Sequence, residues 1–138
     1  RSVCCVVDIG TAATVDAIDR GGRHLGGFIV PGPRLMTASL RAGTSDLAEH
    51  AAQSPDGGSP LFADNTRDAI ERGCRVALAA LVDRSLAELQ HQAGPDAQLI
   101  VTGGASAEVL PYVVSTCLCL PDLVLRGLAV MAQSVLEP

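Results

Sequence analysis

The most informative absence in this chain is lysine, because all ten of its basic residues are arginines. A phosphate-binding loop that depends on a lysine and a lysine that forms a Schiff base are therefore excluded. Tryptophan is absent too, and only one tyrosine and two phenylalanines are present. Since 48% of the 138 residues are apolar, we expect one globular domain whose core is built from leucine, valine, isoleucine and alanine.

Long apolar runs and basic stretches are also missing. No run approaches the roughly 20 residues that cross a bilayer, and no secretory signal opens the chain. The formal net charge is −5 and the arginines do not cluster, so we expect neither a membrane nor a nucleic acid as a partner. The first expected strand begins at residue 3, which predicts that the chain is part of a longer protein.

The cysteines do not have the even count of a disulfide framework. They are Cys4, Cys5, Cys74, Cys117 and Cys119. Because the number is odd and the neighbours are apolar, we expect reduced thiols in the core and a cytoplasmic protein. Cys117 and Cys119 lack the two-residue gap of a zinc knuckle and no histidine is near them, which argues against metal ligation.

The rest of the chain is organised around residues 3–16. Residues 3–7 are apolar and partly β-branched, which is typical of a buried strand, and Asp8 follows directly. Gly10 allows close backbone approach to a ligand, while Thr11 and Thr14 can donate hydrogen bonds to phosphate oxygens. The carboxylate of Asp8 suits Mg²⁺, which prefers oxygen ligands. The alternative is a tight hairpin in which Asp8 only caps the turn.

Periodicity and turn residues predict the remaining elements. Strands are expected at 3–7, 13–18, 24–30, 98–101 and 114–120, and helices at 33–43, 65–93, 106–113 and 122–136. The stretch 44–63 is the least structured, and Arg34 and Arg41 are expected to be solvated. The long helix carries an apolar stripe from Ile70 to Leu89, and the last helix is expected to keep its apolar residues inside.

This order indicates an α/β domain with a mixed sheet. An antiparallel three-strand meander followed by two parallel strands reached through helices is the ribonuclease-H-like topology, inferred here from element order. Ligand sites in such sheets lie at strand ends, where Asp8 falls. Thr102-Gly103-Gly104 also follows a strand and opens a helix, so it can receive a phosphate or lie against a nucleotide. The alternative is that these glycines only make a tight turn.

These motifs together resemble the C-terminal half of the type III pantothenate kinases, in the superfamily of acetate kinase, sugar kinases, heat-shock ATPases and actin. The resemblance covers nearly the whole chain, in family order. It rests on Asp8-Ile-Gly-Thr-Ala-Ala-Thr-Val-Asp16, Gly26-Gly27-Phe-Ile-Val-Pro31-Gly32, Asn65-Thr66 with Ala69, Ile70 and Gly73, Thr102-Gly103-Gly104-Ala105, and Asp122-Leu-Val-Leu125 with Gly127-Leu128.

The resemblance implies a kinase that transfers the γ-phosphoryl group of ATP to pantothenate, the first step toward coenzyme A. Asp8 would hold Mg²⁺. The phosphate and adenosine contacts would come from Gly10, Thr11, Thr14, Gly103 and Gly104. Thr44 would touch pantothenate. The family also uses a monovalent cation, K⁺ or NH₄⁺, and forms homodimers, and its general base belongs to the N-terminal half, so this chain alone is expected to be inactive.

Two departures keep other functions open. The family's Thr-Ala-x-Leu-Pro is Thr44-Ser45-Asp46-Leu47-Ala48 here, and Arg126 stands where a glutamate is usual. The alternatives are a phosphatase or sugar kinase of the same superfamily, and a non-catalytic regulatory or dimerisation module that has lost turnover.

Overall fold

The computed structural model describes residues 2–43 and 61–136. The chain opens with three strands, β1 (Cys4–Ile9), β2 (Ala12–Ile18) and β3 (His24–Pro31). Helices α1 (Pro33–Gly43) and α2 (Thr66–Ala93) follow, and then strand β4 (Gln98–Thr102). The last elements are α3 (Ser106–Val109), the 3-10 helix η1 (Leu110–Tyr112), β5 (Cys117–Cys119) and α4 (Leu123–Leu136).

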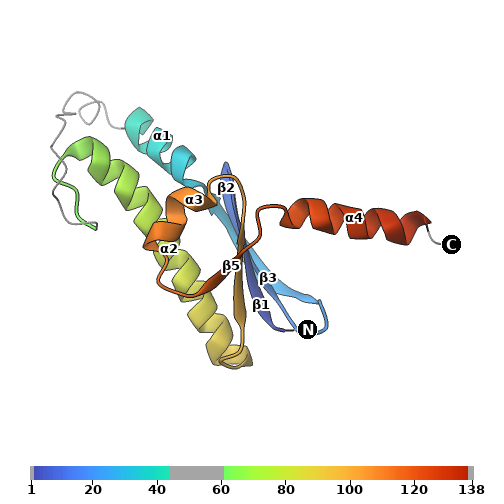
Figure 1. The fold of residues 1–138 in the computed structure, drawn as a ribbon. Helices are drawn as coiled ribbons and strands as arrows, with labels where there is room; N and C mark the ends of the chain where they lie inside the picture. Colours follow the sequence, from blue (N-terminus) through green and yellow to red (C-terminus); the bar gives the residue numbers. More distant parts are fainter. Residues whose placement is uncertain (1, 44–60, 137–138) are drawn as a thin grey trace.

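The five strands form one mixed sheet in the order β3-β2-β1-β4-β5. The pairs β1–β2 and β2–β3 are antiparallel, whereas β4 is parallel to β1 and β5 is parallel to β4. In Figure 1, α1, α2 and α3 lie on one side of the sheet, and α4 leaves from the other side. The predicted ribonuclease-H-like mixed sheet with flanking helices is confirmed.

The core lies between the sheet and α2. Alternate residues of β1 (Cys5, Val7 and Ile9) are buried on the face that α2 covers, because successive side chains of a strand point to opposite faces. Leu78, Val82, Leu86 and Leu89 of α2 are buried in the same cluster. The apolar stripe predicted on the long helix is therefore mostly its contact with the sheet.

Both ends of α2 agree with the prediction. The side chain of Asn65 accepts a hydrogen bond from the amide of Asp68 at 2.9 Å, which satisfies one of the unpaired donors of the first turn. At the other end Gly94 has φ +105° and donates to the carbonyl of Gln90. Asn65 and Gly94 were sufficient to predict the two ends of α2, because a helix cap depends only on residues close in sequence.

The helix predicted at 106–113 is shorter than expected. The α-helix ends at Val109, and the chain tightens into η1. Pro111 explains this, because it has no backbone N–H to donate to Ala107.

The strand predicted at 114–120 also shortens, to Cys117–Cys119. The amides of Val114 and Ser115 donate to the carboxylate of Asp83 on α2, at 3.0 and 2.9 Å. These amides are therefore committed to α2, and pairing with β4 begins only after them.

Two predictions about burial were wrong. Leu125, Leu128, Val130 and Met131 of α4 are not inside: they are exposed along a helix that extends away from the sheet (Figure 1). Of the five cysteines, which are all free thiols, Cys119 is exposed because β5 is the edge strand. Neither α4 nor any other helix in the described ranges is long and apolar enough to span a membrane.

Candidate functional site

Three polar side chains form a row at the end of the sheet where β1 and β4 finish. Asp8 on β1 pairs with Thr102 on β4 in the parallel register and with Thr14 on β2 in the antiparallel register. Paired residues of neighbouring strands lie on the same face of a sheet. This polar row (Thr14, Asp8 and Thr102) is on the face opposite α2, and Asp8 and Thr14 are half-buried there.

Gly103 brings the backbone after β4 against Asp8. Its φ is +96°, and a Cβ at this position would collide with the Asp8 carboxylate and the backbone of Ile9. The next turn is closed by a hydrogen bond from the Ala105 amide to the Ile9 carbonyl, at 2.8 Å. Packing therefore requires a glycine at 103.

Gly104 differs from Gly103. A Cβ at Gly104 would meet nothing within 4 Å, and its φ is not positive. Gly104 is also exposed. The tight-turn alternative therefore accounts for Gly103 but not for Gly104.

The turn between β1 and β2 is closed by its own backbone. The Gly10 amide donates to the Ala12 carbonyl at 2.9 Å, so the turn is held without the Asp8 carboxylate. Thr11 is exposed, and its carbonyl accepts from the Gly32 amide at 2.8 Å. A Cβ at Gly32 would collide with the Gly10 and Thr11 carbonyls, so α1 begins directly against this turn.

Thr102 was predicted only as part of the motif Thr102-Gly103-Gly104, and nothing in the sequence assigned its side chain a role of its own. It is only 2% exposed, and its Oγ1 has no hydrogen-bond partner, the one such buried side-chain atom among residues 2–43 and 61–136. A buried hydroxyl without a partner costs about 1–3 kcal/mol, so a missing ligand or partner is expected nearby. The burial of Thr102 could not be read from the sequence because burial depends on tertiary packing.

The polar row fits a hydrated divalent cation shared with phosphate oxygens. Asp8 supplies an anionic oxygen, and Thr102 supplies an unused hydroxyl beside it. Among the described residues no group of three or more histidine, cysteine, aspartate or glutamate side chains could hold a metal. An ion here would therefore keep waters and ligand oxygens in its shell, as Mg²⁺ usually does.

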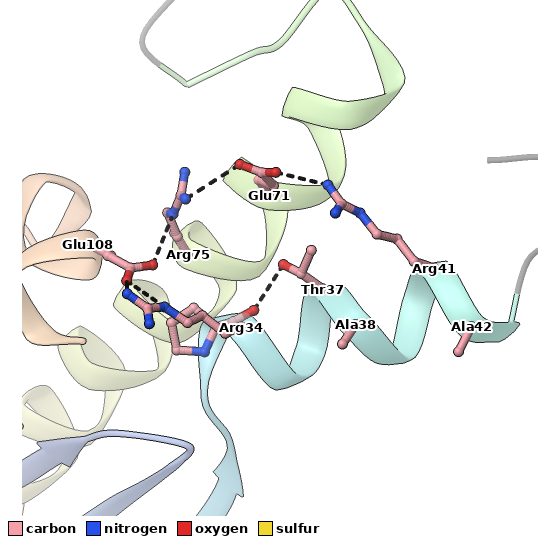
Figure 2. Close-up of a pocket in the computed structure, with 9 residues that line it drawn as sticks. Arg34, Thr37, Ala38, Arg41, Ala42, Glu71, Arg75 and Glu108 are labelled. Carbon is pink, nitrogen blue, oxygen red and sulfur yellow. Dashed lines mark hydrogen bonds and ion pairs between the residues drawn. The ribbon is translucent and has the colours of Figure 1, made fainter. Parts of the chain in front are cut away.

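A cavity of about 770 Å³ lies among α1, α2 and α3, on the side of the sheet opposite the polar row (Figure 1). Its lining is dominated by charged side chains from α1, α2 and α3, as Figure 2 shows. We call it the arginine pocket, after Arg34, Arg41, Arg75, Glu71 and Glu108. Two of the helices that line the pocket begin near the glycine turns. Helix α1 begins next to the Gly10–Thr11 turn, and α3 begins just after Gly104.

Ion pairs connect the three helices around this pocket (Figure 2). Arg34 donates to Glu108 at 2.6 Å and Arg41 donates to Glu71 at 2.9 Å. Arg75 lies between the two glutamates, 3.5 Å from Glu71 and 3.9 Å from Glu108. Three guanidinium groups face two carboxylates, so the pocket has an excess of positive charge that suits an anionic or polar ligand.

Arg34 and Arg41 are exposed, as predicted, but each is also paired with a glutamate of another helix. The Glu71–Arg75 pair has i,i+4 spacing and is readable from sequence, whereas pairs between helices depend on tertiary packing. Thr44, the predicted pantothenate residue, lies outside the described residues.

Comparisons with known proteins identify the family of this chain. Residues 1–88 match the family model of type III pantothenate kinase. A type III pantothenate kinase of Azoarcus sp. (strain BH72) is 43% identical over 131 residues, which are 95% of this chain and 47% of that protein. One from Halorhodospira halophila is 40% identical, over 90% of this chain and 47% of the relative. The chain spans about half the length of these curated relatives.

A solved structure shares the fold. A Baf family protein from Campylobacter jejuni aligns with a TM-score of 0.70 over 99% of this chain and 60% of its own, at 23% sequence identity. At this identity the likeness concerns the fold alone.

Proposed function

Because the chain belongs to the type III pantothenate kinase family, we propose that it is the C-terminal half of a two-domain enzyme that phosphorylates pantothenate with ATP. The product would be 4′-phosphopantothenate, on the route to coenzyme A. The observation that carries the proposal is the polar row with its two glycine turns, at the ends of β1 and β4. Phosphoryl transfer depends mainly on positioning and charge neutralisation, which such a site can supply.

Each residue of the site would have a separate task. Asp8 would orient Mg²⁺, which neutralises charge on the phosphates when it is bound. Thr11 and Thr14 would donate to phosphate oxygens from the β1–β2 turn and from β2, and Gly10, which has no side chain, would let the phosphates approach the turn closely.

The nucleoside would lie over Gly103 and Gly104. From there it would extend around the end of the sheet toward the arginine pocket, which Glu108 of α3 and Arg34 of α1 line. A guanidinium plane is a good stacking surface for a base, and the carboxylate of Glu108 can accept hydrogen bonds from ribose hydroxyls.

The other parts of the proposed enzyme lie outside this half or outside the described residues. The general base would come from the N-terminal half, and Thr44 would contact pantothenate. The enzyme would also use a monovalent cation, K⁺ or NH₄⁺. It would be a homodimer in the cytoplasm.

The departure at position 126 does not favour the non-catalytic alternative. Arg126 forms an i,i+4 pair with Asp122 at 2.9 Å on the surface of α4. An arginine is therefore accommodated there by a local ion pair.

The test is an assay of this chain joined to the N-terminal half of the Azoarcus relative. We expect ADP release that requires pantothenate, and none from this chain alone. A joined protein that folds and binds ATP but releases no ADP with pantothenate would contradict the kinase proposal. Pantothenate-dependent turnover by the chain alone would contradict the division of the site between two halves.

A further inference from the structure

Arg75 lies between the two glutamates of the arginine pocket and makes the longest ion-pair contacts there (Figure 2). Its guanidinium is 3.5 Å from Glu71 and 3.9 Å from Glu108, whereas charge-assisted hydrogen bonds of this kind measure about 2.7–2.9 Å. The side chain is only 30% exposed, so it is largely removed from water. Arg75 is therefore a half-buried cation whose N–H groups can serve another partner.

The two carboxylates of the pocket are held by α1 rather than by Arg75. One oxygen of Glu108 accepts two hydrogen bonds from Arg34, at 2.9 and 2.6 Å. One oxygen of Glu71 accepts a hydrogen bond from Arg41 at 2.9 Å. Since the close contacts go to the arginines of α1, Arg75 is left with the longer ones.

Positive charge around the pocket exceeds negative charge. Four arginines form ion pairs with only two glutamates, Glu71 and Glu108, which leaves an excess of two positive charges. The four are Arg34, Arg41, Arg67 and Arg75. A phosphate monoester carries a charge of about −1.5 to −2 at pH 7 and would balance this excess, whereas a single carboxylate would balance half of it.

The geometry of the pocket also suits a phosphate with a small organic group. Arg41 and Arg75 come from different helices but both contact Glu71, so they can hold different oxygens of one tetrahedral group. The cavity of about 770 Å³ has the size of a small-molecule site and is larger than a bare phosphate requires. The organic group would lie against the smaller side chains of the lining, which are Pro33, Thr37, Ala38 and Ala42.

We propose that the arginine pocket binds the phosphate group of a small phosphate monoester, held by Arg75 of α2 and Arg41 of α1. The site lies on the side of the sheet opposite the polar row and does not depend on the proposed kinase activity. Arg34 is seven residues before Arg41 on α1, about 10 Å away along the helix. A nucleoside that reaches the Arg34–Glu108 end of the pocket would therefore leave the phosphate site open.

The test is a calorimetric titration of the 138-residue chain with glycerol 3-phosphate at constant ionic strength, with inorganic phosphate and glycerol as separate titrants. We expect the ester to bind, inorganic phosphate to bind no more tightly, and glycerol not to bind. In Arg75→Gln the affinity for the ester should fall about tenfold or more, the scale of one lost hydrogen bond between charged groups.

Arg84→Gln is the matched control for Arg75→Gln. It removes the same charge from the same helix, where Arg84 pairs with Glu88 at 2.9 Å outside the pocket. Its affinity for the ester should stay within about twofold of wild type, because an exposed charge elsewhere on the helix is screened by solvent and salt.

Glu71→Gln should change the affinity in the opposite direction. The substitution removes a carboxylate that competes with the ester for Arg41 and Arg75, so the ester should bind about threefold more tightly or better. Damage to the fold could weaken binding but could not tighten it. This variant therefore tests the site even if Arg75→Gln folds poorly.

Four results would overturn the proposal. They are no binding of the ester by wild type, equal affinities of wild type and Arg75→Gln, binding that Glu71→Gln leaves unchanged or weakens, and inorganic phosphate binding much more tightly than the ester. Displacement of the ester by saturating ATP would overturn it as well, because the pocket would then be part of the nucleotide site. That last result would leave the proposed function intact.

Discussion

The Asp8 carboxylate is the residue on which most of the proposed chemistry depends. Asp8 lies between Thr14 and Thr102 in the strand register at the end of the sheet, while the turn after it is closed by a backbone hydrogen bond. An asparagine at this position would keep the size and one carbonyl oxygen but would lose the negative charge. Replacing it therefore tests charge separately from shape.

In the joined enzyme, Asp8→Asn should lower turnover by about 10²-fold or more, the scale of losing one preorganised electrostatic group. ATP binding should weaken much less, because the contacts at Gly10, Gly103 and Gly104 do not need the charge. Steady-state kinetics beside an ATP titration would check this. Turnover within a few-fold of wild type would mean that Asp8 is structural.

The thiols of Cys5 and Cys119 should differ strongly in reactivity. Burial, and to a lesser degree the charges of Cys4 and Asp16, raise the pKa of Cys5 to about 11. At pH 8 only about one thousandth of this thiol would be the reactive thiolate. Cys119 is exposed on the edge strand.

We therefore predict that iodoacetamide labels Cys119 in the native chain and labels Cys5 only after unfolding. Mass spectrometry of digests taken over time would follow both sites. Equal labelling rates in the native chain would show that the face of the sheet next to α2 opens readily.

At the scale of elements, the connection from β4 to α3 contains two glycines that differ in backbone conformation and in the space around them. Gly103→Ala should lower the free energy of unfolding by about 2 kcal/mol or more, because it combines a positive φ with a clash against Asp8 and Ile9. Gly104→Ala should change it by less than about 0.5 kcal/mol. Denaturant unfolding of both variants is the measurement, and equal losses would contradict the turn geometry.

Asp83 of α2 holds the segment that enters β5. Partial burial raises the pKa of Asp83, but hydrogen bonds from the Ser115 side chain and from the amides of Val114 and Ser115 outweigh it, so the pKa lies below its usual 3.8. Its charged form is thus the one that the fold stabilises. This contribution is complete above the unfolded-state pKa, near 3.8, and is lost as the pH falls through the lower folded-state value.

Asp83→Asn should accordingly lower the free energy of unfolding at pH 7 by about 1–2 kcal/mol, a range reduced because the site is partly exposed. The difference between variant and wild type should shrink as the pH falls below 3.8. Urea unfolding at pH 7 and near pH 3 checks both statements. A difference that stays constant with pH would show that the hydrogen bonds do not depend on the charge.

At the scale of the whole molecule, the unusual feature is α4. The apolar stripe from Ile70 to Leu89 of α2 packs mostly against the sheet. The exposed apolar surface is instead on α4, where Leu125 and Leu128 are 68% and 56% exposed. Val124, Val130 and Met131 extend it, and surfaces of this kind usually contact another protein.

We predict that the chain self-associates through α4 and that the double variant Leu125→Glu/Leu128→Glu is a monomer. Light scattering at high concentration would measure this against the monomer mass of 14.1 kDa. The thermal unfolding temperature of the variant should match that of wild type at low concentration, since α4 is not part of the core. A wild-type chain that stays monomeric would contradict the prediction.

The order of elements was predictable because it depends on local signals. The alternation of β1, the cap at Asn65 and the stop at Gly94 are each decided within a few residues. Where the prediction was wrong, at 106–113 and at 114–120, a proline and a long-range hydrogen bond to Asp83 decided the outcome.

By itself the sequence determined the mixed sheet, the family motifs and the placing of Asp8 and Gly103 at strand ends, because strand periodicity and glycine turns are local and strand ends meet at one edge. Only the tertiary structure decided which residues gather there. The unpaired hydroxyl of Thr102 and the arginine pocket arise from the packing of segments far apart in the sequence, as in the pairing of Arg34 with Glu108. Tertiary packing also decides that α4 is exposed. Apolar periodicity shows which face of a helix can be buried, but whether it is buried depends on which surfaces pack against it.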